Sequence, residues 1–314
     1  MITYLKKQNG SFQQLAALEP GCWINLYGPF NNEEVHQLSE KLSIELDFIT
    51  DSLDVDERSR YESEDGVDLI VLKTPVRNTG ITDTEAIYIT IPIGIIRTAE
   101  NIITISPYRN PVIDYFMETP PKSFTTNDVE AFILNIFERN VMMFQDFLKN
   151  LNNRRYAYEK ELYYSSRNED LANLLNIQKS LIYIVTNIRS NELMMMKTQR
   201  SNFLRLKDEE KIDWLSDIVI ENSQALEMSE MYSNILNGTM DTFASIISNN
   251  LNGVMKRLTS VTIVLMVPTL IASFYGMNVA LPLESNPYGF IIIFGFTILM
   301  TLVMAWYFVK RNWF

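Results

Sequence analysis

Two long uncharged segments near the C-terminal end constrain this chain more than any other feature of its sequence. Residues 258–275 supply 18 consecutive uncharged residues, and residues 288–309 supply 22. A helix of roughly 20 apolar residues is long enough to cross the hydrocarbon core of a bilayer. The sequence therefore predicts an integral membrane protein that is held by a C-terminal hairpin of two membrane helices. The alternative is a buried hairpin in a soluble core.

Basic residues flank this predicted hairpin on one side only. Lys256 and Arg257 precede the first segment, Lys310 and Arg311 follow the second, and the connection over residues 276–287 contains neither Lys nor Arg. Cytoplasmic flanks of membrane helices carry an excess of Lys and Arg. We therefore expect a multi-pass protein of the cytoplasmic membrane, with both termini and about 250 N-terminal residues in the cytoplasm.

The predicted cytoplasmic part is strongly acidic. Residues 251–314 hold four basic residues and one acid, which leaves 23 basic and 37 acidic residues, a net charge of −14, in the first 250. This charge disfavours nucleic acid and favours soluble cations as partners. A single cysteine, Cys22, and a single histidine, His36, exclude a disulfide framework and a zinc site built from His and Cys. No phosphate-binding loop or nucleophile elbow occurs in the first 121 residues, so the sequence does not indicate an enzyme.

Glycine and proline divide the cytoplasmic part into two regions. Residues 1–121 contain eight prolines and six glycines, whereas residues 122–237 contain neither. The first region is predicted to be an α/β domain. Its expected strands are residues 67–73, 86–96 and 102–106, with a hairpin at 99–101, and its expected helical patches are residues 31–46 and 48–54. A run without either helix breaker predicts long helices in the second region.

The long helices can be placed from caps and periodicity. Thr126, Asn127 and Asp128 offer an N-cap. A coiled-coil seam is formed by Leu174, Ile177, Leu181, Ile184 and Ile188. We expect an antiparallel helical region over 122–211, with a turn in the polar stretch 200–211, and a stalk helix over 212–275 that continues into the first membrane helix. An outer loop over 276–287, a second membrane helix over 288–309 and a basic tail over 310–314 complete the prediction.

One face of the first membrane helix carries polar residues, glycine or methionine at a spacing of three and four residues. It carries Asn252, Met255, Thr259, Thr262, Met266, Thr269, Ser273 and Gly276, with Leu258 beside it. Small and hydroxyl-bearing residues allow close helix packing in membranes, and they also line ion pathways. Pro268 leaves the carbonyl of Val264 without its usual partner, which favours the pathway because such a group is tolerated beside a water-lined cavity. Two helices cannot enclose a hydrated ion, so a pore requires several subunits.

The residues that follow this face carry a family resemblance. The sequence reads Tyr275-Gly276-Met277-Asn278, with Asn252-Gly-Val-Met-Lys and Met266-Val-Pro-Thr upstream and Lys310-Arg-Asn-Trp-Phe at the end. These motifs and their placement resemble the CorA family of magnesium channels over the whole chain. The resemblance implies a homopentamer in the lipid bilayer, with the first membrane helix lining a pore. It assigns Gly276, Met277 and Asn278 to the selectivity filter. It assigns the pore lining and gate to Asn252, Met255, Leu258, Thr262, Met266, Thr269 and Ser273.

The filter residues suit the chemistry of Mg²⁺. This ion prefers octahedral oxygen coordination and gives up water reluctantly. A ring of Asn278 carboxamides can accept hydrogen bonds from its hydration shell and still release it. Neither membrane segment contains an ionisable group that suits a proton relay, which indicates passive flow driven by the membrane potential. Transport of Co²⁺, Ni²⁺ or Zn²⁺ is the alternative within the family, although zinc-transporting members usually carry another residue where Met277 stands.

The resemblance also implies gating by cytoplasmic Mg²⁺ bound between acidic faces of neighbouring subunits. Asp217 on the predicted stalk falls where the family places one such carboxylate, and Asp83 or Glu85 is its expected partner. Glu284 in the outer loop is a candidate for attracting cations to the pore. The alternative from a different class is a membrane-anchored scaffold or sensor whose acidic coil binds a protein. A pentamer would favour the channel, and a dimer would favour the scaffold.

Overall fold

A computed structural model describes residues 1–8, 11–164, 168–279, 281–283, 286–311 and 313. The chain divides into two compact units, Met1–Asn237 and Gly238–Phe314. The strands are β1 (Ile2–Gln8), β2 (Ser11–Leu15), β3 (Trp23–Tyr27), β4 (Arg60–Glu64), β5 (Val67–Arg77), β6 (Tyr88–Arg97) and β7 (Ile102–Ser106). The helices are α1 (Asn32–Leu42), α2 (Leu46–Leu53), α3 (Pro111–Glu118), α4 (Val129–Tyr164), α5 (Asn168–Ser201), α6 (Glu209–Tyr275) and α7 (Gly289–Lys310).

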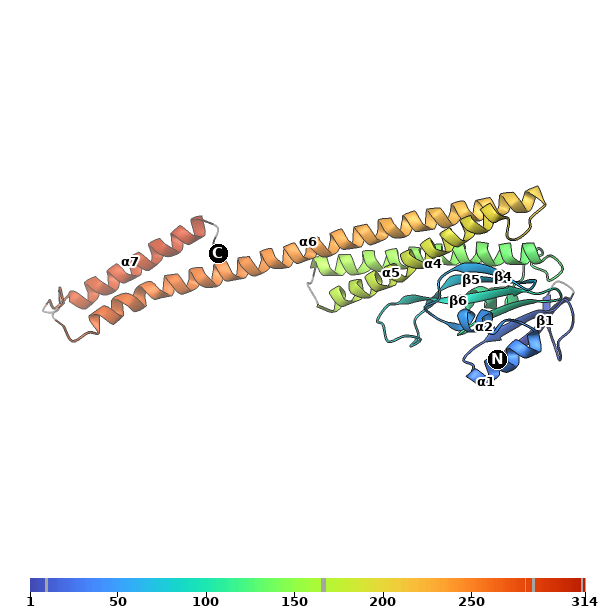
Figure 1. Cartoon of the computed structure of the whole chain (residues 1–314). Coiled ribbons are helices and arrows are strands. Elements are labelled where there is room, and N and C mark those ends of the chain that lie inside the picture. Colours follow the sequence, from blue (N-terminus) through green and yellow to red (C-terminus); the bar gives the residue numbers. More distant parts are fainter. Residues whose placement is uncertain (9–10, 165–167, 280, 284–285, 312, 314) are drawn as a thin grey trace. The chain divides into compact units, whose positions relative to one another are not determined.

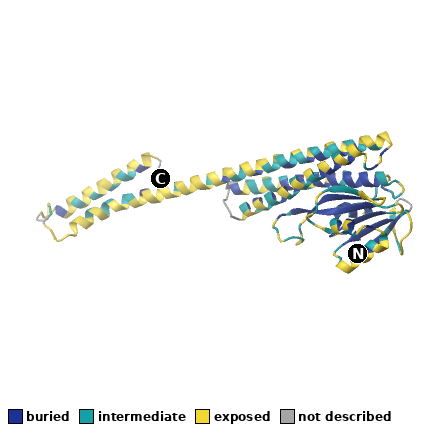
Figure 2. Ribbon diagram, viewed as in Figure 1, coloured by how far each residue is buried: buried dark blue, intermediate teal, exposed yellow. Residues whose placement is uncertain are grey.

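The first unit is built on a seven-stranded mixed sheet in the order β2-β1-β3-β7-β6-β5-β4. Only the β3–β7 pair is parallel, and the other neighbours are antiparallel. Consecutive strand residues point to opposite faces, so Ile95 packs in the core beneath α3, α4 and α5 while Ile96 packs against α1 and α2. Figures 1 and 2 show the sheet with its buried strands between these two helical layers.

The expected strands are confirmed with shifted ends, because β5 ends four residues later than predicted and β6 begins two residues later and ends one residue later. β6 and β7 form the predicted hairpin, in which the Thr98 amide donates to the Asn101 carbonyl at 3.0 Å. β5 extends to Arg77 and passes through Pro75, which the sequence prediction had left out. A proline is tolerated there because β4 pairs only with residues 67–71 of β5, so β5 is an edge strand beyond that point.

The two helical patches predicted over residues 31–46 and 48–54 are confirmed as α1 and α2, although the break between them comes earlier, after Leu42. α1 begins with a capping box in which the Glu34 amide donates to the Asn31 side chain, and it ends where Ser43 adopts a left-handed conformation with φ of 52°. α2 then begins at Leu46 and packs on β6. Gly94 on β6 is required at this contact, because a Cβ there would lie 1.8 Å from the Ser52 hydroxyl oxygen.

The predicted cap and seam of the long helices are confirmed. Asp128 accepts a hydrogen bond from the Ala131 amide at 3.0 Å, so it caps α4. The five predicted seam residues of α5 are at most 1 % exposed. The chain turns between Ser201 and Glu209, within the predicted polar stretch, and α6 then forms one helix of 67 residues.

In the second unit, α7 lies alongside the C-terminal part of α6 (Figure 1). Both helices are long and apolar enough to cross a membrane, and only 6 % of the most apolar 18-residue window of each is buried (Figure 2). A hairpin in a soluble core would bury these windows, so their exposure favours the membrane. The turn before α7 requires glycine, because a Cβ on Gly289 would lie 2.4 Å from the Leu283 carbonyl oxygen.

Candidate ion pathway and acidic cluster

The predicted pore face of α6 is exposed along its whole length. Its members are Asn252, Met255, Leu258, Thr259, Thr262, Met266, Thr269, Ser273 and Gly276, and every one is exposed. Its first residues, Asn252, Met255 and Thr259, share a cavity of about 620 Å³ with Trp313 and still remain exposed. The neighbour of such a face in a membrane is water, lipid or another subunit.

The opposite face of the same helix packs toward α7. Gly253, Ser260, Val264, Val267 and Ile271 are buried or half-buried. Residues from Pro268 to Tyr275 on this side share a cavity of about 670 Å³ with α7 residues. At about 100° per residue, the centre of this face lies roughly 150° from the centre of the polar face. The polar face is thus not the packing surface between the two helices of one chain, and close packing against another subunit stays the alternative to a pore.

The hydroxyls of the polar face keep their oxygens available as acceptors. The Thr262 hydroxyl donates to the Leu258 carbonyl at 2.8 Å, and the Thr269 hydroxyl donates to the Leu265 carbonyl at 2.9 Å. Each hydroxyl proton is used within the helix, while the oxygen retains lone pairs directed away from it. Such oxygens can accept hydrogen bonds from the water shell of a cation.

The Gly-Met-Asn tripeptide forms the turn that ends α6. The Gly276 amide donates to the Ala272 carbonyl at 2.9 Å, and the Met277 amide donates to the Phe274 carbonyl at 3.2 Å. Asn278 is exposed, and within the part of the chain that the structure describes its side chain makes no hydrogen bond. The carboxamide is thus free to contact a solvated ion. Glu284, the predicted cation-attracting residue of the outer loop, lies outside the described residues.

Three carboxylates lie close together in the first unit, those of Asp217 and Glu221 on α6 and that of Glu138 on α4. Asp217 is exposed on α6, and Glu221 follows it one turn later. Burial, together with the negative charges of Glu138 on α4 and of Asp217, raises the pKa of Glu221. The Trp214 indole donates to Glu138 at 3.2 Å and fixes that carboxylate near the group. Sequence reasoning missed Glu138 and Glu221, because their proximity depends on how α4 packs against α6.

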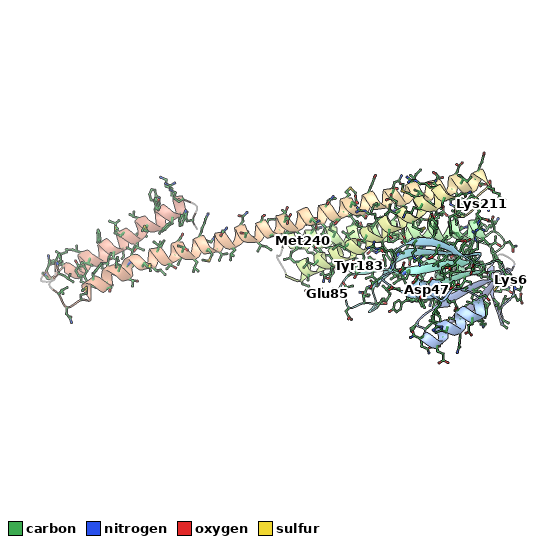
Figure 3. All side chains as sticks on the ribbon, in the orientation of Figure 1. Lys6, Asp47, Glu85, Tyr183, Lys211 and Met240 are labelled. Atoms are coloured by element: carbon green, nitrogen blue, oxygen red, sulfur yellow. The ribbon has the colours of Figure 1, made fainter. Side chains whose placement is uncertain are left out.

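The expected partners of Asp217 come from the loop before β6. Asp83 and Glu85 are both exposed there. Glu85, which Figure 3 labels, pairs with Lys179 of α5 at 2.8 Å, and this contact lowers the pKa of Glu85. Across the described ranges, no three His, Cys, Asp or Glu side chains converge on a single metal position. A regulatory ion bound by Asp217 would therefore need ligands from another subunit or from its own water shell.

An exposed polar helix face that ends in an exposed carboxamide, on a hairpin of two helices long and apolar enough to cross a membrane, fits the class of membrane transporters of cations. A family model described as "CorA-like Mg2+ transporter protein" matches residues 19–311. This chain belongs to the CorA-like Mg²⁺ transporter family.

Individual relatives agree with the family match. The cobalt/magnesium transport protein CorA of Methanocaldococcus jannaschii is 26% identical over 296 residues, covering 93% of this chain and 90% of that protein. The complete structure of the CorA magnesium transporter from the same organism superimposes with a TM-score of 0.83 at 22% identity, covering 100% of this chain and 99% of that one. Full-length CmaX superimposes with a TM-score of 0.69 at 14% identity, covering 100% of this chain and 97% of that one. At these identities the structural likeness establishes the fold alone.

Proposed function

We propose that this chain transports Mg²⁺ across the cytoplasmic membrane as a homopentamer, with the α6 helices around a central pore and both termini in the cytoplasm. Membership of the CorA-like family supports the ion. The observation that carries the proposal for the pathway is the position of the polar face of α6, exposed and roughly opposite the face that packs toward α7. A ring of subunits would bring five such faces together around water.

The filter in this proposal is the ring of Asn278 carboxamides, with Gly276 and Met277 in the same turn. Neutral amides can hold the water shell of Mg²⁺ without replacing it, which suits an ion that dehydrates reluctantly. Further along the pore, Thr269 and Asn252 supply oxygen rings. Met255, Leu258 and Met266 supply an apolar stretch that can close by excluding water. Thr262 and Ser273 complete the polar lining.

The driving force in this proposal is the membrane potential. A divalent ion gains about 4.6 kcal/mol in crossing 100 mV, and this requires no coupled proton. Co²⁺ is a second cargo, because the relative from M. jannaschii is named a cobalt/magnesium transport protein. Oxygen ligands do not by themselves exclude Ni²⁺ or Zn²⁺.

Closure in this proposal depends on cytoplasmic Mg²⁺ at the acidic surface around Asp217. The repulsion that raises the pKa of Glu221 would be relieved by a bound divalent cation. Ions between Asp217 of one subunit and Asp83 or Glu85 of the next would therefore hold the cytoplasmic units together. Loss of these ions at low Mg²⁺ would release the units and allow the pore to open.

The filter can be tested with Asn278→Ala in proteoliposomes. We expect Mg²⁺ flux to fall at least tenfold while the oligomer and its thermal stability are retained, because an exposed side chain leaves no buried partner unsatisfied. Asn249→Ala removes an exposed carboxamide from another face of the same helix and should conduct like the parent. Parental flux in Asn278→Ala would show that the filter lies elsewhere on the polar face.

A further inference from the structure

A second site candidate lies in the first unit, far in sequence from the membrane helices. A cavity of about 650 Å³ opens between the loop before β4, strands β5 and β6, and helix α5. This volume is in the range of pockets that hold small organic ligands. Transport through the α6 pore makes no use of it.

Lys73 is the most unusual residue in the wall of this cavity. Its side chain is only 3 % exposed, and its ammonium donates to the carbonyl of Val55. An ammonium has three donors, and no other hydrogen bond from it occurs among the residues that the structure describes. Lysine is almost never buried without an anionic partner, because removing the charge from water is costly.

A second polar group in the same wall has no partner. The hydroxyl oxygen of Thr82 is buried and makes no hydrogen bond within the described part of the chain. Buried polar atoms are almost always satisfied by protein or by an ordered molecule. Lys73 and Thr82 come from different segments, so one cavity holds two independent groups that have hydrogen-bond donors left without an acceptor.

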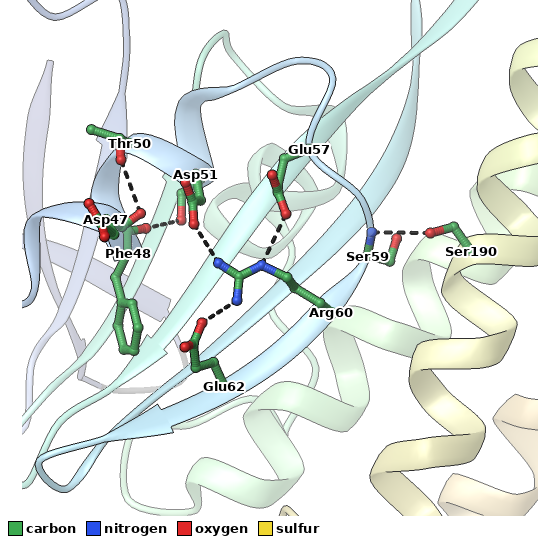
Figure 4. Close-up of polar contacts among 10 residues, drawn as sticks. Asp47, Phe48, Thr50, Asp51, Glu57, Ser59, Arg60, Glu62 and Ser190 are labelled. Atoms are coloured by element: carbon green, nitrogen blue, oxygen red, sulfur yellow. Dashed lines mark hydrogen bonds and ion pairs between the residues drawn. The ribbon is translucent and has the colours of Figure 1, made fainter.

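The nearby carboxylates do not supply that acceptor by direct contact. Glu57 is held by Arg60, with Nε to Oε1 at 3.0 Å, and Arg60 also pairs with Asp51 and Glu62 (Figure 4). Asp56 and Arg58, which carry opposite charges, both line the cavity. Burial lowers the pKa of Lys73 to about 8 while Asp56, Asp54 and Glu57 oppose this shift, so the ammonium is mostly charged at neutral pH.

The loop before β4, which forms one wall of the cavity and carries Asp56, Glu57 and Arg58, is firmly anchored. The Ser59 amide donates to the Ser190 hydroxyl at 3.1 Å (Figure 4), and the Ser59 hydroxyl donates to the Asn191 side chain at 2.6 Å. The loop before β4 is thereby fixed to α5. A cavity whose walls are held in place can bind a ligand without first ordering a loop.

We propose that this cavity binds a small organic anion, with its acidic group against Lys73 and Thr82. The carboxylate or phosphate group would accept hydrogen bonds from the free ammonium donors and from the Thr82 hydroxyl. Its apolar body would lie against Ile89, Tyr183 and Leu193, which line the remainder of the cavity. The cytoplasmic part would then carry an organic-anion site that is separate from its acidic cation-responsive surface.

The test uses the full chain in lipid nanodiscs and four probes that share one ring. Benzoate and phenyl phosphate carry the proposed anionic groups, benzamide is neutral, and benzamidinium is cationic. Binding is followed by calorimetry and by saturation-transfer NMR. We expect either or both anions to bind, at least fivefold more tightly than benzamide and benzamidinium. Binding of benzoate alone would identify a carboxylate ligand, and binding of phenyl phosphate alone a phosphate monoester.

Two variants assign the binding to the proposed groups. Lys73→Met should weaken anion binding at least tenfold, and Thr82→Val should weaken it about threefold or more, as expected for hydrogen bonds to a charged and a neutral donor. Thr82→Val removes a hydroxyl without a partner and should fold like the parent, so it remains informative if Lys73→Met does not fold. Lys197→Met, which changes an exposed lysine of the same helix α5, is the control and should bind like the parent.

Three results would overturn the proposal. The first is binding of benzamide or benzamidinium that is as tight as binding of the anions, or tighter. The second is anion binding that is unchanged in folded Lys73→Met and Thr82→Val. The third is no binding of either anion at about 10 mM, a concentration that would detect even a dissociation constant in the millimolar range. None of these results bears on Mg²⁺ transport, so failure here is distinguishable from failure of the pore.

Discussion

Asn191 should be one of the most important residues for the stability of the cytoplasmic part. It is fully buried on α5, and its carboxamide oxygen accepts hydrogen bonds from the Lys73 amide at 3.0 Å and the Ser59 hydroxyl at 2.6 Å. Its amide group donates to the Lys73 carbonyl at 2.8 Å. These contacts join α5 to the edge of β5 beyond the end of β4, where the strand has no other neighbour on that side.

The cost of Asn191→Ala follows from these contacts. The buried Lys73 amide loses its acceptor, at about 1–3 kcal/mol, and the other two hydrogen bonds contribute about 1 kcal/mol each. The Lys73 carbonyl keeps its bond from Asn140 at 3.0 Å, which limits the loss. We expect the free energy of unfolding to fall by about 3–5 kcal/mol. For a unit of this size the melting temperature should fall by roughly 6–20 °C.

Tryptophan fluorescence during thermal unfolding measures this change, because Trp23 is fully buried in the same unit. The matched control is Asn187→Ala, one turn earlier on α5. Among the residues that the structure describes, the Asn187 side chain donates to the Tyr183 carbonyl of its own helix alone, at 2.8 Å, so its removal should cost less than about 1 kcal/mol. Equal melting temperatures for the two variants would refute the role assigned to Asn191.

Three further predictions concern gating, pH and topology. Asp217→Ala should raise residual Mg²⁺ flux at millimolar cytoplasmic Mg²⁺, and unchanged inhibition would remove Asp217 from the regulatory surface. The folded-state pKa of Lys73 is about 8, below its ordinary value of 10.5, so between these values the unfolded chain binds more protons and stability should rise with pH. Lys73→Met should lose that part of the rise in melting temperature, and an identical pH profile would contradict the assignment. A thiol reagent should label Val279→Cys from outside the cell and Gln13→Cys only from inside, while the native Cys22 is buried and should give little background. Labelling of Val279→Cys from the cytoplasm would exclude the pore.

The sequence predicted those elements whose signal is local. Uncharged length indicated the membrane helices, and apolar runs indicated β5, β6 and β7. Strands β1 and β3 were missed, and β3 is a buried run of only five residues, too short for its periodicity to identify a strand. The edge strands β2 and β4 were missed because they are short, largely polar and only partly covered, so they lack the apolar alternation that indicates a strand. Their pairing with β1 and β5 defines them instead.

The site divides in the same way. The polar face of α6 and the tripeptide that follows it are contiguous patterns, so both were predictable. The approach of Glu138 to Glu221 joins α4 to α6 across about 80 residues of sequence, and the cavity at Lys73 joins segments from three parts of the chain. Such arrangements depend on tertiary packing, and no periodicity along the chain encodes them.

We propose that this chain by itself conducts Mg²⁺ down the membrane potential, and this conduction can be measured. It is tested most directly by reconstituting the purified protein in liposomes that contain a Mg²⁺-sensitive dye and imposing a potassium diffusion potential of 100 mV, negative inside. We expect Mg²⁺ uptake that depends on the protein, ceases when the potential is removed in the absence of a Mg²⁺ gradient, and stops at or below the electrochemical limit of roughly 2,000-fold accumulation. Uptake that is absent, or that continues without potential or gradient, would contradict it.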